Sequence, residues 1–231
     1  LRLAATLTMR PVGGAPVTRQ VSTITIANTW AAADVVIMTV GGSKDLRVTI
    51  GSAFGVSDVA AALAAAINAA DATTGLIGNE TRNVGGQEIL EFFGLEAVAA
   101  LGVVTITGLV SGQPFTLTAS EVTAGTGTAT AASVTAATGP NHADNADNWL
   151  AGTLPASNDD LYFDRGDVSC LYGLDHFRTA TKSIDLIITN DWTGQMGLDP
   201  ISPGGYAEYR TRFFQTYGNS LINLDAGVKS L

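Results

Sequence analysis

The stretch WLAGTLPASNDDLYFDRGDVSCLYGLDHF, residues 149–177, carries the pattern on which the fold prediction depends. A tryptophan, a Gly-Thr-Leu-Pro turn and a pair of aspartates lead into short apolar runs that include Gly173-Leu174-Asp175. The tripeptide returns at Gly197-Leu198-Asp199, and a near copy follows at Asn223-Leu224-Asp225. The equivalent leucines lie 24 and 26 residues apart. This spacing predicts a β-solenoid-like domain over residues 141–231, with an irregular β-sandwich as the alternative.

Upstream, residues 21–122 have the pattern of a small α+β module. Residues 21–27, 34–40 and 46–51 alternate between apolar and polar side chains, and Gly41-Gly42 marks a hairpin turn. Two further strands are expected at 103–109 and 114–120. Together with one helix, they predict an antiparallel sheet that the helix covers on one face, and a fold that is mainly β.

The helix of this module is predicted from Ser57 to the alanine-rich segment near residue 70. Ser57 is expected as the N-cap, with Asp58 in the first turn, where a negative charge is favourable. Val59, Leu63 and Ile67 recur at helical spacing and define the face that is expected to be buried.

The remaining segments carry weaker signals. Residues 1–20 are interpreted as an N-terminal arm, and the polar, glycine-bearing residues 72–91 as a long loop. Residues 123–140 are low in complexity and are interpreted as a linker, in preference to an extended strand lying on a neighbour.

Composition excludes some classes of function. The formal net charge of −9 argues against binding to nucleic acid, because no surplus of Lys and Arg is present to neutralise phosphates. No apolar run approaches the roughly 20 residues that a membrane-spanning helix needs. The single cysteine, Cys170, lies in an apolar run and is expected to be a buried hydrophobic residue.

Candidate metal ligands and catalytic residues are few. Asp144, Asp147, Asp159 and Asp160 are weak candidates for a Ca²⁺ site, because their spacing fails the EF-hand pattern and Asx residues also form turns. A carboxylate set of the kind that hydrolyses glycosides is conceivable at Asp175, Asp185 and Asp199. His142 and His176 have no nucleophile motif beside them. The sequence therefore predicts a protein that is not an enzyme and that has no cofactor.

The aromatic residues are expected to serve packing and assembly. Trp149 and Tyr172, with their aromatic neighbours Tyr162 and Phe163, are predicted to close the open end of the solenoid core. A second group lies in residues 205–218 and is interpreted as a lateral loop or an inter-subunit contact. This group contains Tyr206, Tyr209, Arg210 and Arg212.

The chain resembles virion proteins of tailed bacteriophages over residues 27–69, 111–149 and 150–175. The resemblance includes an Asn-Trp, Gly-x-x-Pro and Asp series at the start of the apolar runs. In this resemblance Trp149 and Pro155 close and turn the chain into the first coil. It implies a capsid decoration or head-fibre protein on the virion surface. The implied partners are further copies of the chain, as a homotrimer, and the major capsid protein or another virion protein. The alternative is a tail spike or adhesin that binds host surface glycans, with or without hydrolysing them.

Overall fold

The computed structural model describes residues 5–40, 44–51, 55–68, 81–84, 87–90, 94–156, 159–173, 185–197 and 222–224. Contacts divide the chain into two units. Residues within 19–137 form the α+β unit, and the described residues within 5–18 and 138–224 form the parallel-strand unit. No helix among the described residues has both the length and the apolar character that are needed to cross a bilayer.

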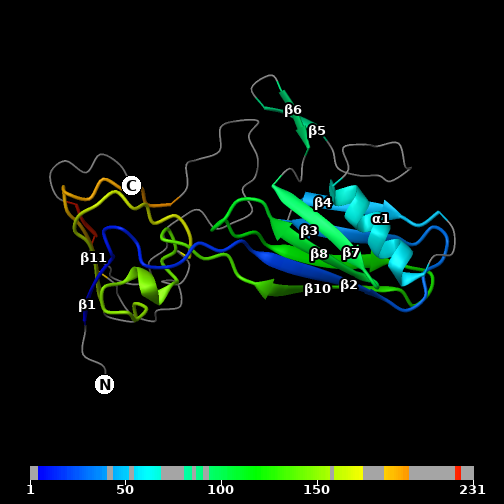
Figure 1. Ribbon diagram of the computed structural model, residues 1–231, viewed down its shortest axis with the longest axis horizontal. Helices are drawn as coiled ribbons and strands as arrows, with labels where there is room; N and C mark the ends of the chain where they lie inside the picture. The colour runs from blue at the N-terminus through cyan, green and yellow to red at the C-terminus, as the bar shows by residue number, and fades with distance from the viewer. Residues whose placement is uncertain are drawn as a thin grey trace. The chain divides into compact units, whose positions relative to one another are not determined.

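The α+β unit is built from two antiparallel sheets and one helix (Figure 1). One sheet has the strand order β10-β2-β8-β7, and the other has the order β4-β3-β9. A separate hairpin consists of β5 and β6. The strands are β2 (Val21–Ala27), β3 (Val35–Val40), β4 (Lys44–Thr49), β5 (Thr81–Val84), β6 (Gln87–Leu90), β7 (Leu95–Ala100), β8 (Val103–Gly108), β9 (Leu117–Val122) and β10 (Thr128–Thr135).

Helix α1 (Val56–Asn68) covers one face of the four-stranded sheet and contacts β7, β8, β2 and β4 (Figure 1). The predicted face is the buried one, since Val59, Leu63 and Ile67 are at most 1% exposed. They share one core with alternate residues of the strands, among them Ile24 and Val104. The prediction of a mainly β fold, with a helix packed on antiparallel strands, is confirmed.

Both ends of α1 are closed by side-chain hydrogen bonds. At the start, the Asp58 carboxylate accepts the backbone N–H of Gly55 (3.0 Å), so Gly55 is the cap and the predicted cap Ser57 lies inside the helix. At the end, the Asn68 amide both donates to the carbonyl of Ala97 (2.6 Å) and accepts from its N–H (2.8 Å). Asn68 thereby satisfies backbone groups on β7, the outer strand of its sheet, that would otherwise be open.

Three segments differ from their predicted form. The expected loop at 72–91 contains the hairpin β5–β6. In place of a linker, residues 128–135 form β10, which pairs with β2 along its length. Within the expected N-terminal arm, residues 6–8 form β1, which pairs with a distant strand. Short strands, and strands built from Thr and Ala, lack the large apolar residues that mark a strand in a sequence.

The parallel-strand unit contains β1 (Thr6–Thr8), β11 (Asp160–Phe163), β12 (Asp185–Ile188) and β13 (Ile222–Leu224). They form one sheet in that order, and all three pairs are parallel. Leu7, Leu161, Leu186 and Ile222 are in register across the sheet. Leu224 pairs with Ile188, so the repeat inferred from the leucine spacing does not give the register of these strands.

The α+β unit lies between two segments of the parallel-strand unit in the sequence, so the chain leaves that unit at residue 18 and re-enters it at residue 138. These two crossing points pair with each other. The Thr18 N–H donates to the Thr138 carbonyl (2.9 Å), and the two threonine hydroxyls are 2.9 Å apart. The α+β unit is therefore an insertion whose ends are held together.

The cap of α1 gives a direct test of where the helix begins. Asp58→Ala removes the acceptor for the Gly55 N–H, so we expect the free energy of unfolding to fall by about 0.5–1 kcal/mol. Ser57→Ala is the matched control and should leave stability almost unchanged, because Ser57 is exposed and is not the cap. Denaturant unfolding measures both, and a larger loss at Ser57 would show that the helix begins two residues later.

Candidate functional site

The side chain of Asn148 connects three segments of the parallel-strand unit. It is fully buried in a single 3₁₀ turn, Ala146–Asn148. Its Oδ1 accepts the N–H groups of Gly14 (2.9 Å) and Ala15 (3.0 Å). Its Nδ2 donates to the carbonyls of Gly139 (2.8 Å) and His142 (2.8 Å). We call these five residues the Asn148 hub.

Only an asparagine-like amide fits this position. Two N–H groups converge on one end of the side chain and two carbonyls on the other, so donors and acceptors match and all four hydrogen-bonding positions of the amide are used. Glycine is required beside it, because a Cβ on Gly14 would overlap the carbonyl of Asp147. The hub therefore holds the segment around residue 14 against the turn that carries Asn148.

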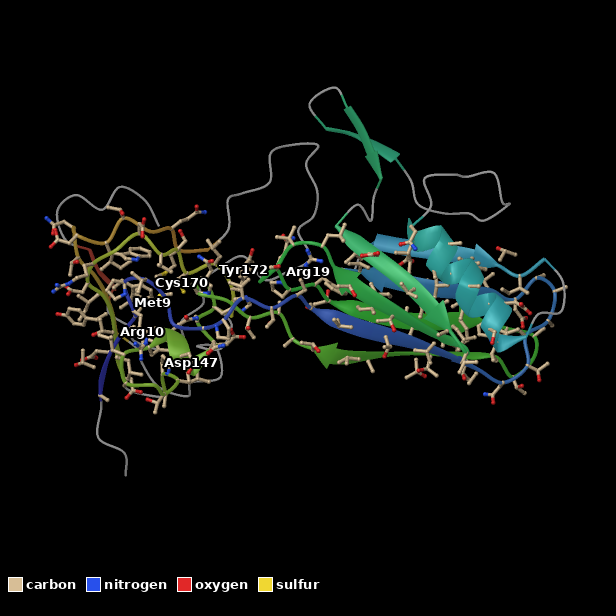
Figure 2. The ribbon with its side chains drawn as sticks, viewed as in Figure 1. Met9, Arg10, Arg19, Asp147, Cys170 and Tyr172 are labelled. Carbon is tan, nitrogen blue, oxygen red and sulfur yellow. The ribbon has the colours of Figure 1, made fainter. Side chains whose placement is uncertain are left out.

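Trp149 extends the hub into the core. Its ring is completely buried, donates from Nε1 to the Ala143 carbonyl (2.9 Å) and meets the Phe163 ring edge-on at 6.1 Å. Its own carbonyl accepts from Nε of Arg10 (3.3 Å). Met9, Arg10, Asp147 and Cys170, labelled in Figure 2, belong to the same unit, and Met9 and Cys170 share the core of Trp149.

Asp159 makes a second connection to the N-terminal segment. It is fully buried, and its carboxylate accepts the N–H of Ala5 through Oδ1 (3.0 Å) and the N–H of Ala156 through Oδ2 (2.8 Å). The first bond aligns β1 with β11, and the second closes the turn that follows the buried Pro155. Asp159 thus performs the turn-forming role that Asx residues often have.

The other predicted metal ligands do not join Asp159 in a metal-binding group. Asp144 is exposed and lies 3.3 Å from Nδ1 of His142, Asp147 is exposed in the 3₁₀ turn, and Asp160 lies in β11. Among the described residues, no three or more His, Cys, Asp or Glu side chains are grouped so that they could hold a metal ion.

Cys170 lies beside this region in a fully enclosed position. Burial, followed by the negative charge of Asp144, raises the pKa of the Cys170 thiol to about 12. Its N–H donates to the Gln195 carbonyl, and its own carbonyl accepts from Gly197, so the residue joins two successive segments of the unit. The thiol is therefore a packing group in its protonated form, as expected.

Tyr172 is partly buried and packs against the His142 ring, with 4.9 Å between ring centroids.

Several predicted residues lie outside the described part of the chain. These are Tyr206, Tyr209, Arg210, Arg212, Asp175, Asp199 and His176. Asp185 begins β12 and is in register with Asp160.

Sequence reasoning noticed the Asn-Trp pair but gave a role only to the tryptophan. The role of Asn148 depends on Gly14 and Ala15, more than 130 residues away in the sequence, and no local pattern reveals such partners. The one available signal was the adjacent pair Gly13-Gly14, since paired glycines often mark a close approach of backbone. Chemically, the site is a buried set of amide and backbone groups that can hold chain segments together.

The hub can be tested by converting its amide to a carboxylate. Asn148→Asp loses both donors and places a buried negative charge against two carbonyls, so we expect the unit to lose more than about 3 kcal/mol of stability. The matched control is Asn145→Asp, because Asn145 only accepts, from the N–H of Asp147, and a carboxylate can accept equally well. Chemical denaturation followed by Trp fluorescence measures both; equal effects would contradict the role of the hub.

The Cys170 thiol predicts a pH dependence. Its pKa is raised in the folded state, so the stability that it contributes is fully present below about pH 9 and is lost as the pH rises toward 12. We expect iodoacetamide to label native protein at pH 9 far more slowly than denatured protein, as measured by mass spectrometry. Rapid labelling of the native chain would mean that the thiol is accessible and ionised.

No protein-family model matches this chain, and a comparison with curated proteins finds no match either. A functional proposal therefore depends on the parallel strands, on the hub and on the resemblance of the sequence motifs.

Proposed function

We propose that this chain is a structural component of a bacteriophage virion, as a capsid decoration or head-fibre protein on the particle surface. The observation that carries the proposal is the in-register parallel stacking of β1, β11, β12 and β13. Such stacking builds a rigid, extended body from backbone hydrogen bonds. The virion assignment is supported by the motif resemblance around residues 148–160.

We further propose that the parallel strands are the first coils of a β-solenoid. Strands β11 and β12 are displaced by 25 residues, from Asp160 to Asp185. Two more parallel bridges, Gly166 with Trp192 and Cys170 with Met196, have displacements of 26 residues. Pairing at nearly the same displacement in three successive places is what two stacked coils produce. The step from Leu186 to Ile222 is longer, which a solenoid accommodates as an insertion in one coil.

The proposed partners are other copies of the chain and the major capsid protein or another virion protein. Among the described strands, β1 and β13 are the two ends of the parallel sheet, and open sheet edges favour pairing with another chain. We therefore expect a homotrimer, or another stable homo-oligomer with closed symmetry.

The second candidate is a tail spike or adhesin that binds host glycans. The register of Asp160 with Asp185 favours it, because it places two acidic residues on neighbouring parallel strands. Glycoside hydrolysis requires a pair of acidic residues, and neighbouring strands in a sheet are about 4.8 Å apart. Hydrolysis of a surface polysaccharide would be the strongest form of this candidate.

Two assays together test the proposed function. Antibodies against this chain should label purified phage particles in electron micrographs, with pre-immune serum as the control. The purified chain should release no reducing sugar from host surface polysaccharide. Particles that stay unlabelled would contradict the virion proposal. Sugar release that Asp185→Asn abolishes, while Asp167→Asn leaves it intact, would favour the tail-spike candidate instead.

A further inference from the structure

The four-stranded sheet of the α+β unit has a second face, opposite the helix, that no described part of the chain covers. Residues on this face alternate with core residues such as Ile24 and Val104, and each of them is partly or fully exposed. We call it the threonine face. It consists of Val21, Thr23, Thr25, Ala27, Glu96, Val98, Ala100, Val103, Thr105, Thr107, Thr128, Thr130 and Ala132.

The strand register places these threonines next to one another. Thr23 is opposite Thr105 on β8, and Thr25 is opposite Thr130 on β10. Neighbouring strands are about 4.8 Å apart, and alternate residues of one strand about 7 Å apart. The hydroxyls therefore form a patch over three adjoining strands, with Val98, 63% exposed, at its margin on β7.

This face is almost free of charge. Glu96, opposite Thr107 on the edge strand β7, is the one charged residue of the face and of the four strands, whereas the whole chain carries a formal net charge of −9. Two copies of an acidic chain repel each other where their charges meet, and they repel least where both surfaces are neutral. A basic partner would be drawn to the acidic surfaces instead. The charge distribution thus favours a second copy as the occupant of this face.

The hydrogen-bonding chemistry points the same way. A hydroxyl is both donor and acceptor, so a threonine surface is complementary to itself, whereas a carboxylate surface can only accept. Within the described part of the chain, the hydroxyls of Thr23 and Thr105 have no hydrogen-bonding partner. Association about a two-fold axis requires such self-complementarity, because the same patch is contributed by both subunits.

We propose that the threonine face is a two-fold interface between copies of this chain. The inference does not rest on the virion assignment or on a trimer formed through the parallel-strand unit. Four strands of about 20 Å length give a face of roughly 400 Å² in projection, which is small for a stable complex, so the interface should be reversible. Its effect is to join assemblies in pairs, whatever oligomer the rest of the chain forms.

The test introduces like charges at the centre of the face. In Thr105→Glu, two carboxylates would oppose each other across the interface, so the assembly mass measured by analytical ultracentrifugation should fall to half that of the parent chain. Thr118→Glu is the matched control, because Thr118 is an exposed strand residue on β9, in the other sheet. It should keep the parent mass.

A mixing experiment guards against misfolding of a variant. Thr105→Lys should also have half the parent mass, and an equimolar mixture of the Lys and Glu variants should restore the full mass, because opposite charges then meet. The proposal is overturned if Thr105→Glu keeps the parent mass, if the parent is itself a monomer at high concentration, or if the mixture remains at half mass.

Discussion

The parallel-strand unit depends on one buried amide. Asn148 satisfies two backbone N–H groups from the N-terminal segment and two carbonyls from the segment that precedes the 3₁₀ turn. Ala15, Gly139 and His142 are buried, so their backbone groups would be left without a partner if the amide were absent, and an unpaired buried polar group costs about 1–3 kcal/mol. The strands of this unit are short, and the hub and the backbone hydrogen bonds that the Asp159 carboxylate accepts add connections between them.

This arrangement explains how a long insertion is tolerated. The chain leaves the parallel-strand unit at Thr18, forms an α+β unit with its own core, and returns at Thr138, where the two segments pair. In the parallel sheet, β1 pairs with one side of β11, and β12 and β13 follow on the other side.

The sequence predicted the parts of the fold that have local causes. The face of α1 followed from helical spacing at Val59, Leu63 and Ile67, and most strands of the α+β unit followed from alternation. It did not predict β10, whose Thr and Ala residues resemble a linker, or β1, whose partner is about 154 residues away. The hub escaped prediction for the same reason, because its contacts are long-range. Leucine spacing gave the wrong register because the chain is longer between the paired residues of β12 and β13 than between those of β11 and β12.

Native-state hydrogen exchange of the Gly14 and Ala15 amides tests the central claim most directly. Both amides donate to Asn148, so they should exchange only when the whole parallel-strand unit opens, at the same free energy as the Cys170 amide in the core of that unit. Exchange of Gly14 and Ala15 at the rate of an unstructured peptide, while the Cys170 amide stays protected, would contradict the account, because the N-terminal segment would then be bound without the help of Asn148.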